Sequence, residues 1–343
     1  MIYLDSAAMA PPLQCAVDAW RSAPFGNPSS AHAAGRAARA ALEAARETVA
    51  ACAGVSPEEI IFTATATEAA ALALHSAREA GYVPICSPFE HHAVTENAYG
   101  APDRQNAPGA VVCQMYANNE TGEIFPFPSD KLNPGDLLLC DATAAAGHVP
   151  FPPAQPAYLF ADALKFGGVP GAAFLVAEKG APLTPLLRGG GQERGVRSGT
   201  ENLPAICAMA AALNWQTEHM EENTDRLAAL WTILFSDLDE IPNRHWNTPP
   251  RPRLPHILNV SFDGVLGEVL ALLLSEEGVM VSAGAACSAG TREPSRTLMA
   301  MYRDPRRAAS AIRLSLSPET TLTEIGEAAE KIKKTVAYLR SAH

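Results

Sequence analysis

The sequence predicts an α/β protein whose mostly parallel sheet is covered by helices on both faces. Three observations lead to this fold class. The chain has 343 residues, of which 48% are apolar and 18% charged, and this composition is sufficient for a large buried core in one or two domains. Several short runs are apolar throughout, as in strands that are buried on both faces. These runs alternate with helical patterns, which is typical of repeated strand-helix-strand units.

The first predicted helix covers residues 36–53. It contains no Gly or Pro, is dominated by Ala, Leu, Glu and Arg, and stops at Gly54, a residue type that often ends helices. Residues 26–30, which precede it, have the composition of a turn. Six short apolar runs then predict the strands of the sheet, at residues 60–62, 83–86, 111–116, 137–140, 158–160 and 172–176.

The C-terminal part has a different character. A long helical pattern over residues 203–239 is followed by five prolines between Pro242 and Pro255. These prolines mark the end of the helical pattern and the start of a loop. We therefore predict a large domain over residues 13–245 and a smaller α+β domain over residues 246–343, with residues 1–12 packing on the smaller one. The elements expected after the prolines are strands at 257–262 and 311–316 and helices at 267–277 and 323–339.

The charge balance and the longest apolar runs exclude two classes of partner. Lys and Arg number 26 against 37 Asp and Glu, so the net charge is −11, and no basic block is present. Nucleic-acid binding is disfavoured because it needs clustered positive charge. The longest apolar runs, such as residues 205–213 and 268–274, fall short of the roughly 20 residues that cross a bilayer. We expect neither a nucleic acid nor a membrane as partner.

The N-terminus and the cysteines indicate the compartment. The first residues lack the basic segment, apolar stretch and small-residue cleavage site of a signal peptide, so the cytoplasm is expected. The seven cysteines are scattered, and none forms a Cys-x-x-Cys pair. An odd, scattered set argues against both a disulfide framework and a structural zinc site. No metal site is predicted.

Two charged residues follow predicted strands, at the edge of the sheet where α/β proteins bind ligands. Lys165 comes after the strand at 158–160 and before the glycines at 167 and 168. It is either a solvated loop lysine or a lysine that reaches a ligand. Asp141 ends the strand at 137–140. It either caps the following helix or pairs with a cationic ligand atom.

Two further segments are candidates for chemistry. Cys287 lies among small residues at 282–290, whereas structural cysteines are usually buried among large apolar neighbours. An accessible loop is the setting expected for a reactive thiol, although a structural thiol remains open. Residues 188–200 form a glycine-rich run with several donors, which on its own is a weak signal for anion binding.

Taken together and in order, these segments resemble the cysteine desulfurases of the NifS/IscS type, which are pyridoxal 5'-phosphate (PLP) enzymes of the class V aminotransferase family. The segment Gly-Asn-Pro-Ser-Ser-Ala-His at 26–32 is close to the family signature. The resemblance covers nearly the whole chain and implies the fold of PLP-dependent transferases, fold type I. Further matching segments are residues 3–8, 90–94, 117–122, 189–193, 197–200, 284–288 and 293–295.

The resemblance implies three residues at the reacting end of the cofactor. Lys165 would hold PLP as its Schiff-base lysine. Asp141 would pair with the pyridine nitrogen and keep the ring protonated, so that the cofactor acts as an electron sink. His91 would lie over the ring and assist proton transfer, since imidazole titrates near neutral pH.

The resemblance also implies contacts for substrate and phosphate. Asn119 would contact the ring oxygen or the substrate, and Arg313 would bind the substrate carboxylate with its planar guanidinium. Ala66 and Thr67 would donate to the phosphate at a helix N-terminus. Thr200 would reach the phosphate of the other subunit, which implies a homodimer.

The activity implied by the resemblance is cysteine desulfuration. L-Cysteine would yield L-alanine, and the Cys287 thiolate would take the sulfur as a persulfide. The sulfur would then pass to an acceptor protein, such as an iron–sulfur scaffold or a sulfur carrier.

Several positions depart from the family pattern. Where the family has Ser-x-His-Lys, this chain has Asp162-Ala-Leu-Lys165, so a serine and a histidine at the phosphate are lost. An aspartate facing the phosphate would repel it. Ala144 replaces a glutamine that donates to the ring oxygen, and Thr65 replaces a glycine. Each lost charge-assisted hydrogen bond costs roughly 1.5–3 kcal/mol, so we expect weaker cofactor binding.

Two other hypotheses stand beside the desulfurase. One is a related PLP lyase that acts on selenocysteine or another β-substituted amino acid. The other is a homologue that has lost catalysis and serves as a partner subunit, which the departures Asp162, Leu164 and Ala144 motivate. The retained lysine, aspartate, histidine, cysteine and arginine favour the enzyme.

Overall fold

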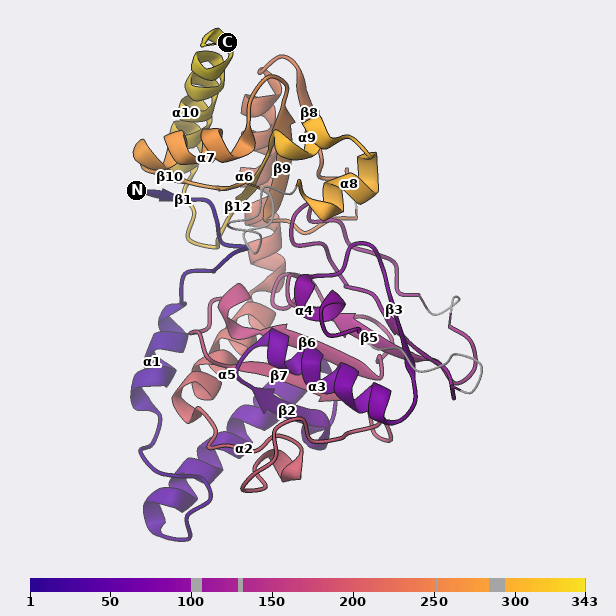
Figure 1. Ribbon diagram of the computed structural model, residues 1–343. Coiled ribbons are helices and arrows are strands. Elements are labelled where there is room, and N and C mark those ends of the chain that lie inside the picture. Colours follow the sequence, from indigo (N-terminus) through magenta and orange to yellow (C-terminus); the bar gives the residue numbers. More distant parts are fainter. Residues whose placement is uncertain (100–106, 129–131, 251, 284–293, 343) are drawn as a thin grey trace. The chain divides into compact units, whose positions relative to one another are not determined.

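The computed structural model (Figure 1) describes residues 1–99, 107–128, 132–250, 252–283 and 294–342. The chain divides into two compact units. Unit 1 consists of Met1–Ala10, Ala117–Phe125 and Met220–His343, and unit 2 consists of Pro11–Tyr116 and Pro126–His219. None of the helices in the described part combines the length and the apolar character needed to cross a membrane.

Unit 2 contains a six-stranded sheet with the strand order β2-β7-β6-β5-β4-β3. The pairs β3 with β4, β4 with β5 and β5 with β6 are parallel, and β7 is antiparallel to both of its neighbours. The predicted mostly parallel sheet is therefore confirmed. Its strands are β2 (Ile60–Thr63), β3 (Val83–Cys86), β4 (Ala110–Cys113), β5 (Leu137–Asp141), β6 (Tyr158–Asp162) and β7 (Ala173–Ala177).

Helices cover both faces of this sheet because successive strand residues point to opposite sides. In β2, Ile60 and Phe62 pack into a core with helices α1, α2 and α5. Ile61 packs into a second core with α3 and α4 (Figure 1). The helices are α1 (Gln14–Ser22), α2 (Ala33–Ala53), α3 (Ala66–Glu79), α4 (His92–Thr95) and α5 (Leu203–Glu218), with single 3-10 turns η1 (Pro57–Glu59), η4 (Ala163–Lys165) and η5 (Glu193–Gly195).

The limits of α2 follow from its end residues. His32 accepts the N–H of Gly35 through its side chain, so the helix begins three residues before the predicted start. It ends at Gly54, whose φ of 69° lies in the left-handed region that favours glycine.

Unit 1 contains an antiparallel sheet with the order β11-β12-β9-β8, and a short parallel pair of β1 with β10. One apolar core joins this sheet to the long helices α6 and α10 and to α7. The elements are β1 (Ile2–Tyr3), α6 (Met220–Asp239), β8 (Arg244–Trp246), β9 (Ile257–Phe262), α7 (Gly267–Glu276), β10 (Val279–Met280), β11 (Ser282–Ala283), α8 (Arg296–Tyr302), α9 (Pro305–Ala309), β12 (Ala311–Ser315) and α10 (Leu322–Ser341).

The division into units corrects the predicted boundary near residue 245. The helical pattern over residues 203–239 forms two helices, α5 and α6, which meet at His219, and the units divide there. The reason is packing, since Leu227, Leu230 and Leu234 of α6 are buried in the same core as β9 and α10. Ala117–Phe125 also belongs to unit 1, whereas the prediction placed this segment inside the large domain of 13–245.

Candidate active site

Asp141 and Lys165 lie at the carboxyl ends of two adjacent parallel strands in unit 2. Asp141 is the last residue of β5, directly opposite Phe160 of β6, and its side chain is buried. Its Oδ1 accepts the N–H of Thr143 at 2.8 Å. Lys165 lies in η4, three residues after the end of β6. The two side chains thus belong to the same edge of the sheet, the usual ligand edge of α/β proteins.

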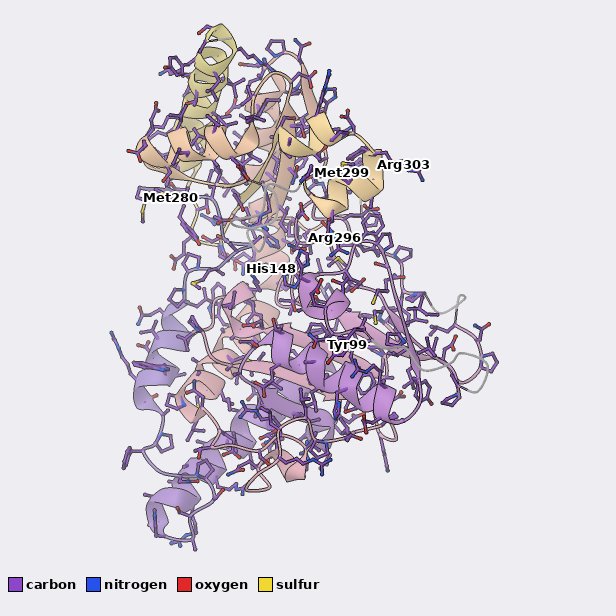
Figure 2. The ribbon with its side chains drawn as sticks, viewed as in Figure 1. Tyr99, His148, Met280, Arg296, Met299 and Arg303 are labelled. Atoms are coloured by element: carbon purple, nitrogen blue, oxygen red, sulfur yellow. The ribbon has the colours of Figure 1, made fainter. Side chains whose placement is uncertain are left out.

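The backbone at Lys165 is held by two buried polar side chains. The Nε2 of His148, labelled in Figure 2, lies 3.2 Å from the carbonyl oxygen of Lys165. Because a carbonyl only accepts, this nitrogen carries the proton. Burial lowers the pKa of His148 to about 4, so the ring stays neutral near pH 7. Gln216 donates to the carbonyl of Phe166 at 3.2 Å. The sequence analysis missed both residues.

His91 begins α4, close to a buried carboxyl group. Its Nδ1 accepts the N–H of Ala93 at 3.0 Å, so the neutral ring carries its proton on Nε2. Glu90 Oε1 accepts from Ser87 and from the N–H of Met115, both at 2.7 Å. Glu90 Oε2 is buried without a hydrogen-bond partner among the described residues. Burial, with a smaller contribution from the Asp141 charge, raises the pKa of Glu90 to about 7.

The N-terminus of α3 carries the two residues predicted to hold a phosphate, Ala66 and Thr67. The Ala66 N–H donates to Oδ2 of Asp162 at 2.8 Å. The other oxygen of Asp162 accepts the N–H of Leu164 at 3.3 Å. Asp162 is only 5% exposed, and this burial raises its pKa. The structure therefore places a carboxylate of the chain itself on the predicted phosphate donor.

Side chains of the glycine-rich run at residues 188–200 pair with side chains of helices α2 and α3. Arg197 pairs with Glu68 of α3 at 2.7 Å. Glu193 forms a buried ion pair with Arg46 of α2, also at 2.7 Å. These contacts fix the run along the sheet unit, and Thr200 at its end is exposed.

In unit 1, the fold brings Arg313 and Asn119 together. Arg313 lies in β12 and is 1% exposed. Its Nη1 donates to the Asn119 carbonyl at 2.8 Å, and its Nη2 donates to Oδ1 of Asp5 at 2.7 Å. The Nε atom is buried without a hydrogen-bond partner in the described part of the chain. The pairing with Asp5 was not foreseen, although Asp5 belongs to a matching segment at the N-terminus.

The predicted site residues thus form two described groups. Unit 2 holds Lys165, Asp141, His91, Ala66, Thr67 and Thr200, and unit 1 holds Arg313 and Asn119. Cys287, the predicted nucleophile, lies outside the described residues.

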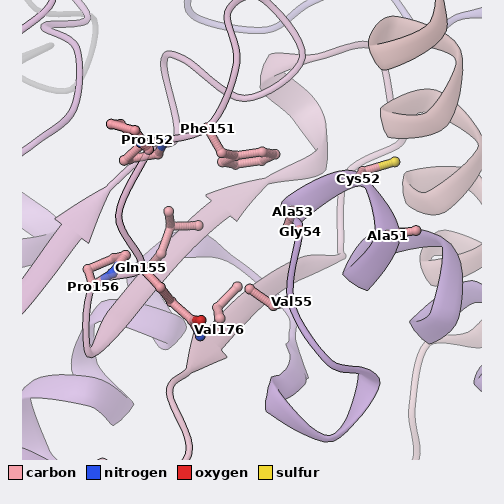
Figure 3. A pocket seen from close by; sticks show the side chains of 12 residues that line it. Ala51, Cys52, Ala53, Gly54, Val55, Phe151, Pro152, Gln155, Pro156 and Val176 are labelled. Atoms are coloured by element: carbon pink, nitrogen blue, oxygen red, sulfur yellow. The ribbon is translucent and has the colours of Figure 1, made fainter.

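A cavity of about 380 Å³ in unit 2 lies apart from these residues (Figure 3). It is lined by the end of α2 at residues 51–55, by the loop at Phe151 and Pro152, and by Leu159 and Val176 of the sheet. None of the predicted site residues contributes to its lining. This cavity is not the candidate active site.

Comparison with known proteins identifies relatives along nearly the whole chain. The chain matches the aminotransferase class-V family over residues 2–108 and 104–327. It is 35% identical to a cysteine desulfurase of Enterobacter agglomerans, over 92% of this chain and 87% of the relative. It is 32% identical to an IscS-like cysteine desulfurase of Mycobacterium tuberculosis, over 100% of this chain and 98% of the relative.

Solved structures give the same result. A NifS-like protein superimposes with a TM-score of 0.88 at 31% identity, covering 98% of this chain and 99% of the other. A NifS-like protein from Rickettsia africae gives a TM-score of 0.89 at 25% identity, with the same coverage. These matches agree with the predicted fold of PLP-dependent transferases. The chain therefore belongs to the class V aminotransferase family, as an enzyme of the NifS/IscS cysteine desulfurase type.

Proposed function

We propose that the chain binds PLP at Lys165 and converts L-cysteine to L-alanine, with transfer of the sulfur to Cys287. The observation that carries this proposal is the placement of Asp141 and Lys165 at the ends of the neighbouring strands β5 and β6. A buried carboxylate and a lysine at one edge of a parallel sheet form a suitable pair for the ring nitrogen and the aldehyde of PLP. The cysteine desulfurases among the relatives support the same chemistry.

The residues of unit 2 suit the ring of this cofactor. Asp141 supplies a buried acceptor for a protonated ring nitrogen. Thr143, two residues on, has a buried hydroxyl without a hydrogen-bond partner among the described residues. Buried polar atoms are normally paired, so this hydroxyl supports a polar ligand at the β5 edge. Ala144 cannot supply the side-chain donor that the family has at that position.

When bound, PLP supplies an electron sink for the bonds at the substrate α-carbon. Lys165 moves the α-proton in this proposal, and the buried His148 keeps its backbone in place. His91 presents an Nε2 proton, since its Nδ1 is used as the cap of α4. A neutral imidazole in this tautomer can donate a proton to substrate.

Arg313 is the proposed binding group for the substrate carboxylate. The guanidinium is fixed by Asp5 and by the Asn119 carbonyl, and its Nε–H is still unpaired among the described residues. A planar guanidinium held in this way offers a preorganised donor to a carboxylate. Asn119 accepts from Arg313 through its backbone carbonyl, so this contact does not use its side-chain amide.

Cys287 is the proposed sulfur acceptor. Its thiolate attacks the sulfur of the bound cysteine, an S–S bond forms as the Cβ–S bond breaks, and the carbon skeleton takes up a proton at Cβ to leave as alanine. The enzyme keeps a persulfide on Cys287 and passes the sulfur to an acceptor protein. A homodimer is part of the proposal, in which the exposed Thr200 serves the phosphate of the partner subunit.

Replacement of the lysine tests the cofactor assignment. Lys165→Ala is expected to lose both the absorbance of lysine-bound PLP and the formation of alanine, because no other lysine of the described residues lies at this edge of the sheet. Lys179→Ala is the matched control. Lys179 lies on an exposed loop after β7, at the opposite edge of the sheet from Lys165. Release of sulfide by Lys165→Ala at the wild-type rate would contradict the assignment.

Replacement of the cysteine separates the desulfurase from the lyase hypothesis. Cys287→Ser is expected to keep the PLP absorbance but to form no persulfide and little alanine. Mass spectrometry after incubation with cysteine locates the added sulfur, and Cys207→Ser is the control. Full turnover by Cys287→Ser, or a persulfide on another cysteine, would favour a lyase that acts on selenocysteine or another β-substituted amino acid.

One observation favours a second candidate, a partner subunit without catalysis. Asp162 occupies the N–H of Ala66, where an active relative would be expected to hold the phosphate. Failure of the wild-type chain to bind PLP at saturating concentration would select this second candidate.

A further inference from the structure

Two N–H donors of the first turn of α3 are already paired within the chain. The Ala66 N–H donates to Asp162, and the Glu68 N–H donates to the Thr65 hydroxyl at 3.2 Å. The N–H of Ala64, just before the helix, donates to the Glu68 carboxylate at 2.8 Å. A helix N-terminus attracts anions because its N–H groups are unpaired and its dipole is positive. Here Asp162 is the anion that takes this place.

The charges around Asp162 do not offset the free-energy cost of burying its carboxylate. Lys165 lowers the pKa of Asp162, as do the N–H groups of Ala66 and Leu164, whereas Asp141 raises it. Burial is the largest effect and gives a net rise. Glu68, the other carboxylate of this helix turn, is neutralised by Arg197. Asp162 is therefore the group whose charge responds most directly to a second anion at the same donors.

We propose that Asp162 competes with the phosphate group of PLP for the N-terminus of α3, so that loading of the phosphorylated cofactor is coupled to proton uptake by Asp162. This inference rests on the proposed function, which places PLP at Lys165. Two anions on one donor set repel each other, and protonation of the carboxyl group relieves that repulsion. Asp162 then acts as a specificity residue for the phosphate, and the cofactor-free chain is favoured as the pH rises.

The test compares PLP with pyridoxal, which has the same aldehyde and ring but no phosphate. Dissociation constants of both are measured by absorbance and equilibrium dialysis at about pH 6 and about pH 8.5, for the wild type, Asp162→Asn and the exposed control Asp18→Asn. Asparagine keeps an acceptor for the Ala66 N–H but carries no charge. At about pH 8.5 we expect Asp162→Asn to bind PLP roughly tenfold more tightly than the wild type. This ratio should shrink as the pH is lowered from about 8.5 to about 6, because protonation of the Asp162 carboxyl group removes the charge that competes with the phosphate.

Pyridoxal supplies the internal control. Its affinity should be equal in the wild type and Asp162→Asn, because it places no anion at α3. The wild type alone gives a further readout, in which PLP affinity falls more steeply with rising pH than pyridoxal affinity does. Asp162→Ser provides a second variant if Asp162→Asn does not fold, as judged by circular dichroism.

Four results would overturn the inference. Equal PLP affinity of Asp162→Asn and wild type at about pH 8.5 would show that the carboxylate does not compete. An equal gain for pyridoxal would show that the effect lies at the ring. Absence of any PLP or pyridoxal adduct on Lys165 in every variant would overturn the proposed function together with the inference, whereas normal binding with no pH-dependent gap would overturn the inference alone.

Discussion

Two carboxylates of the chain lie on groups that are expected to bind anions, and they act on those groups differently. Asp162 accepts the N–H of Ala66 at the start of α3, and this N–H is the group that is expected to donate to the phosphate. Asp5 binds one end of the Arg313 guanidinium and leaves Nε without a partner among the described residues. The first carboxylate occupies a donor, and the second orients a cation that has donors to spare. A carboxylate beside a group that is expected to bind an anion can therefore weaken anion binding, by occupying the donor, or support it, by orienting the donor.

Among the variants that test this comparison, Asp5→Ala is expected to have the largest effect. Asp5→Ala leaves the buried Arg313 cation without its carboxylate, and loss of one partner of a buried pair costs about 3–5 kcal/mol. We expect the lower end of that range because the Asp5 side chain is 21% exposed. The free energy of unfolding in urea measures it, and KM for cysteine should rise roughly tenfold as the guanidinium loses its orientation.

The control for Asp5 is the double variant Asp5→Ala with Arg313→Leu. Removing both charges should restore part of the lost stability without restoring activity. If Asp5→Ala instead lowered KM, Asp5 would compete with substrate as Asp162 is proposed to compete with phosphate, and the two regions would be alike.

Glu90 is a third carboxyl group to set beside Asp162 and Asp5, and it is buried. One of its oxygens has no hydrogen-bond partner among the described residues. Its pKa is raised from 4.5 to about 7, so the folded chain binds more protons than the unfolded chain between these values. Its contribution to stability is therefore fully present below about pH 4.5 and is lost as the pH rises through about 7. Glu90→Gln should stabilise the chain by up to roughly 3 kcal/mol at about pH 8, and have no such effect at about pH 4.

Urea unfolding of the Glu90→Gln variant at both pH values measures this effect. Glu96→Gln is the matched control, since Glu96 is exposed on the same segment. Equal stability of Glu90→Gln and the wild type at both pH values would mean that the carboxyl group is not buried as the structure shows.

The smallest effect concerns Thr65, which caps α3 without a charge. Thr65→Ala removes the acceptor for the Glu68 N–H, and loss of such a cap costs about 1 kcal/mol. The ratio of PLP to pyridoxal affinity should stay at its wild-type value, because Asp162 still holds Ala66. A change in that ratio comparable to the Asp162→Asn effect would assign the competition to the whole helix turn.

The fold was predictable from local patterns, and its division into units was not. Apolar runs reveal buried strands because their side chains point into helices on both faces. A proline-rich stretch reveals loops, but it does not say which core a preceding helix joins, and α6 joins the core of β9 and α10.

The candidate site shows the same limit. The positions of Lys165 and Asp141 at strand ends followed from the sequence. The contact of Asp162 with Ala66 spans 96 positions, and that of Asp5 with Arg313 spans 308. His148 gave no signal, because a histidine after a glycine is ordinary until the turn places it against the Lys165 carbonyl.

The composition of unit 1 has a consequence for synthesis on the ribosome. Its segment Met1–Ala10 emerges before the other segments of unit 1, but β1 pairs with β10 near Val279, and Leu4 is fully buried in the same core. The strands and helices of unit 2 have all been made once α5 ends at Glu218, so unit 2 can close its core while residues 1–10 still lack their partner β10. Closure over so long a stretch of chain is slow. The core of unit 1 and the pairing of Asp5 with Arg313 therefore need residues that are made after all of unit 2.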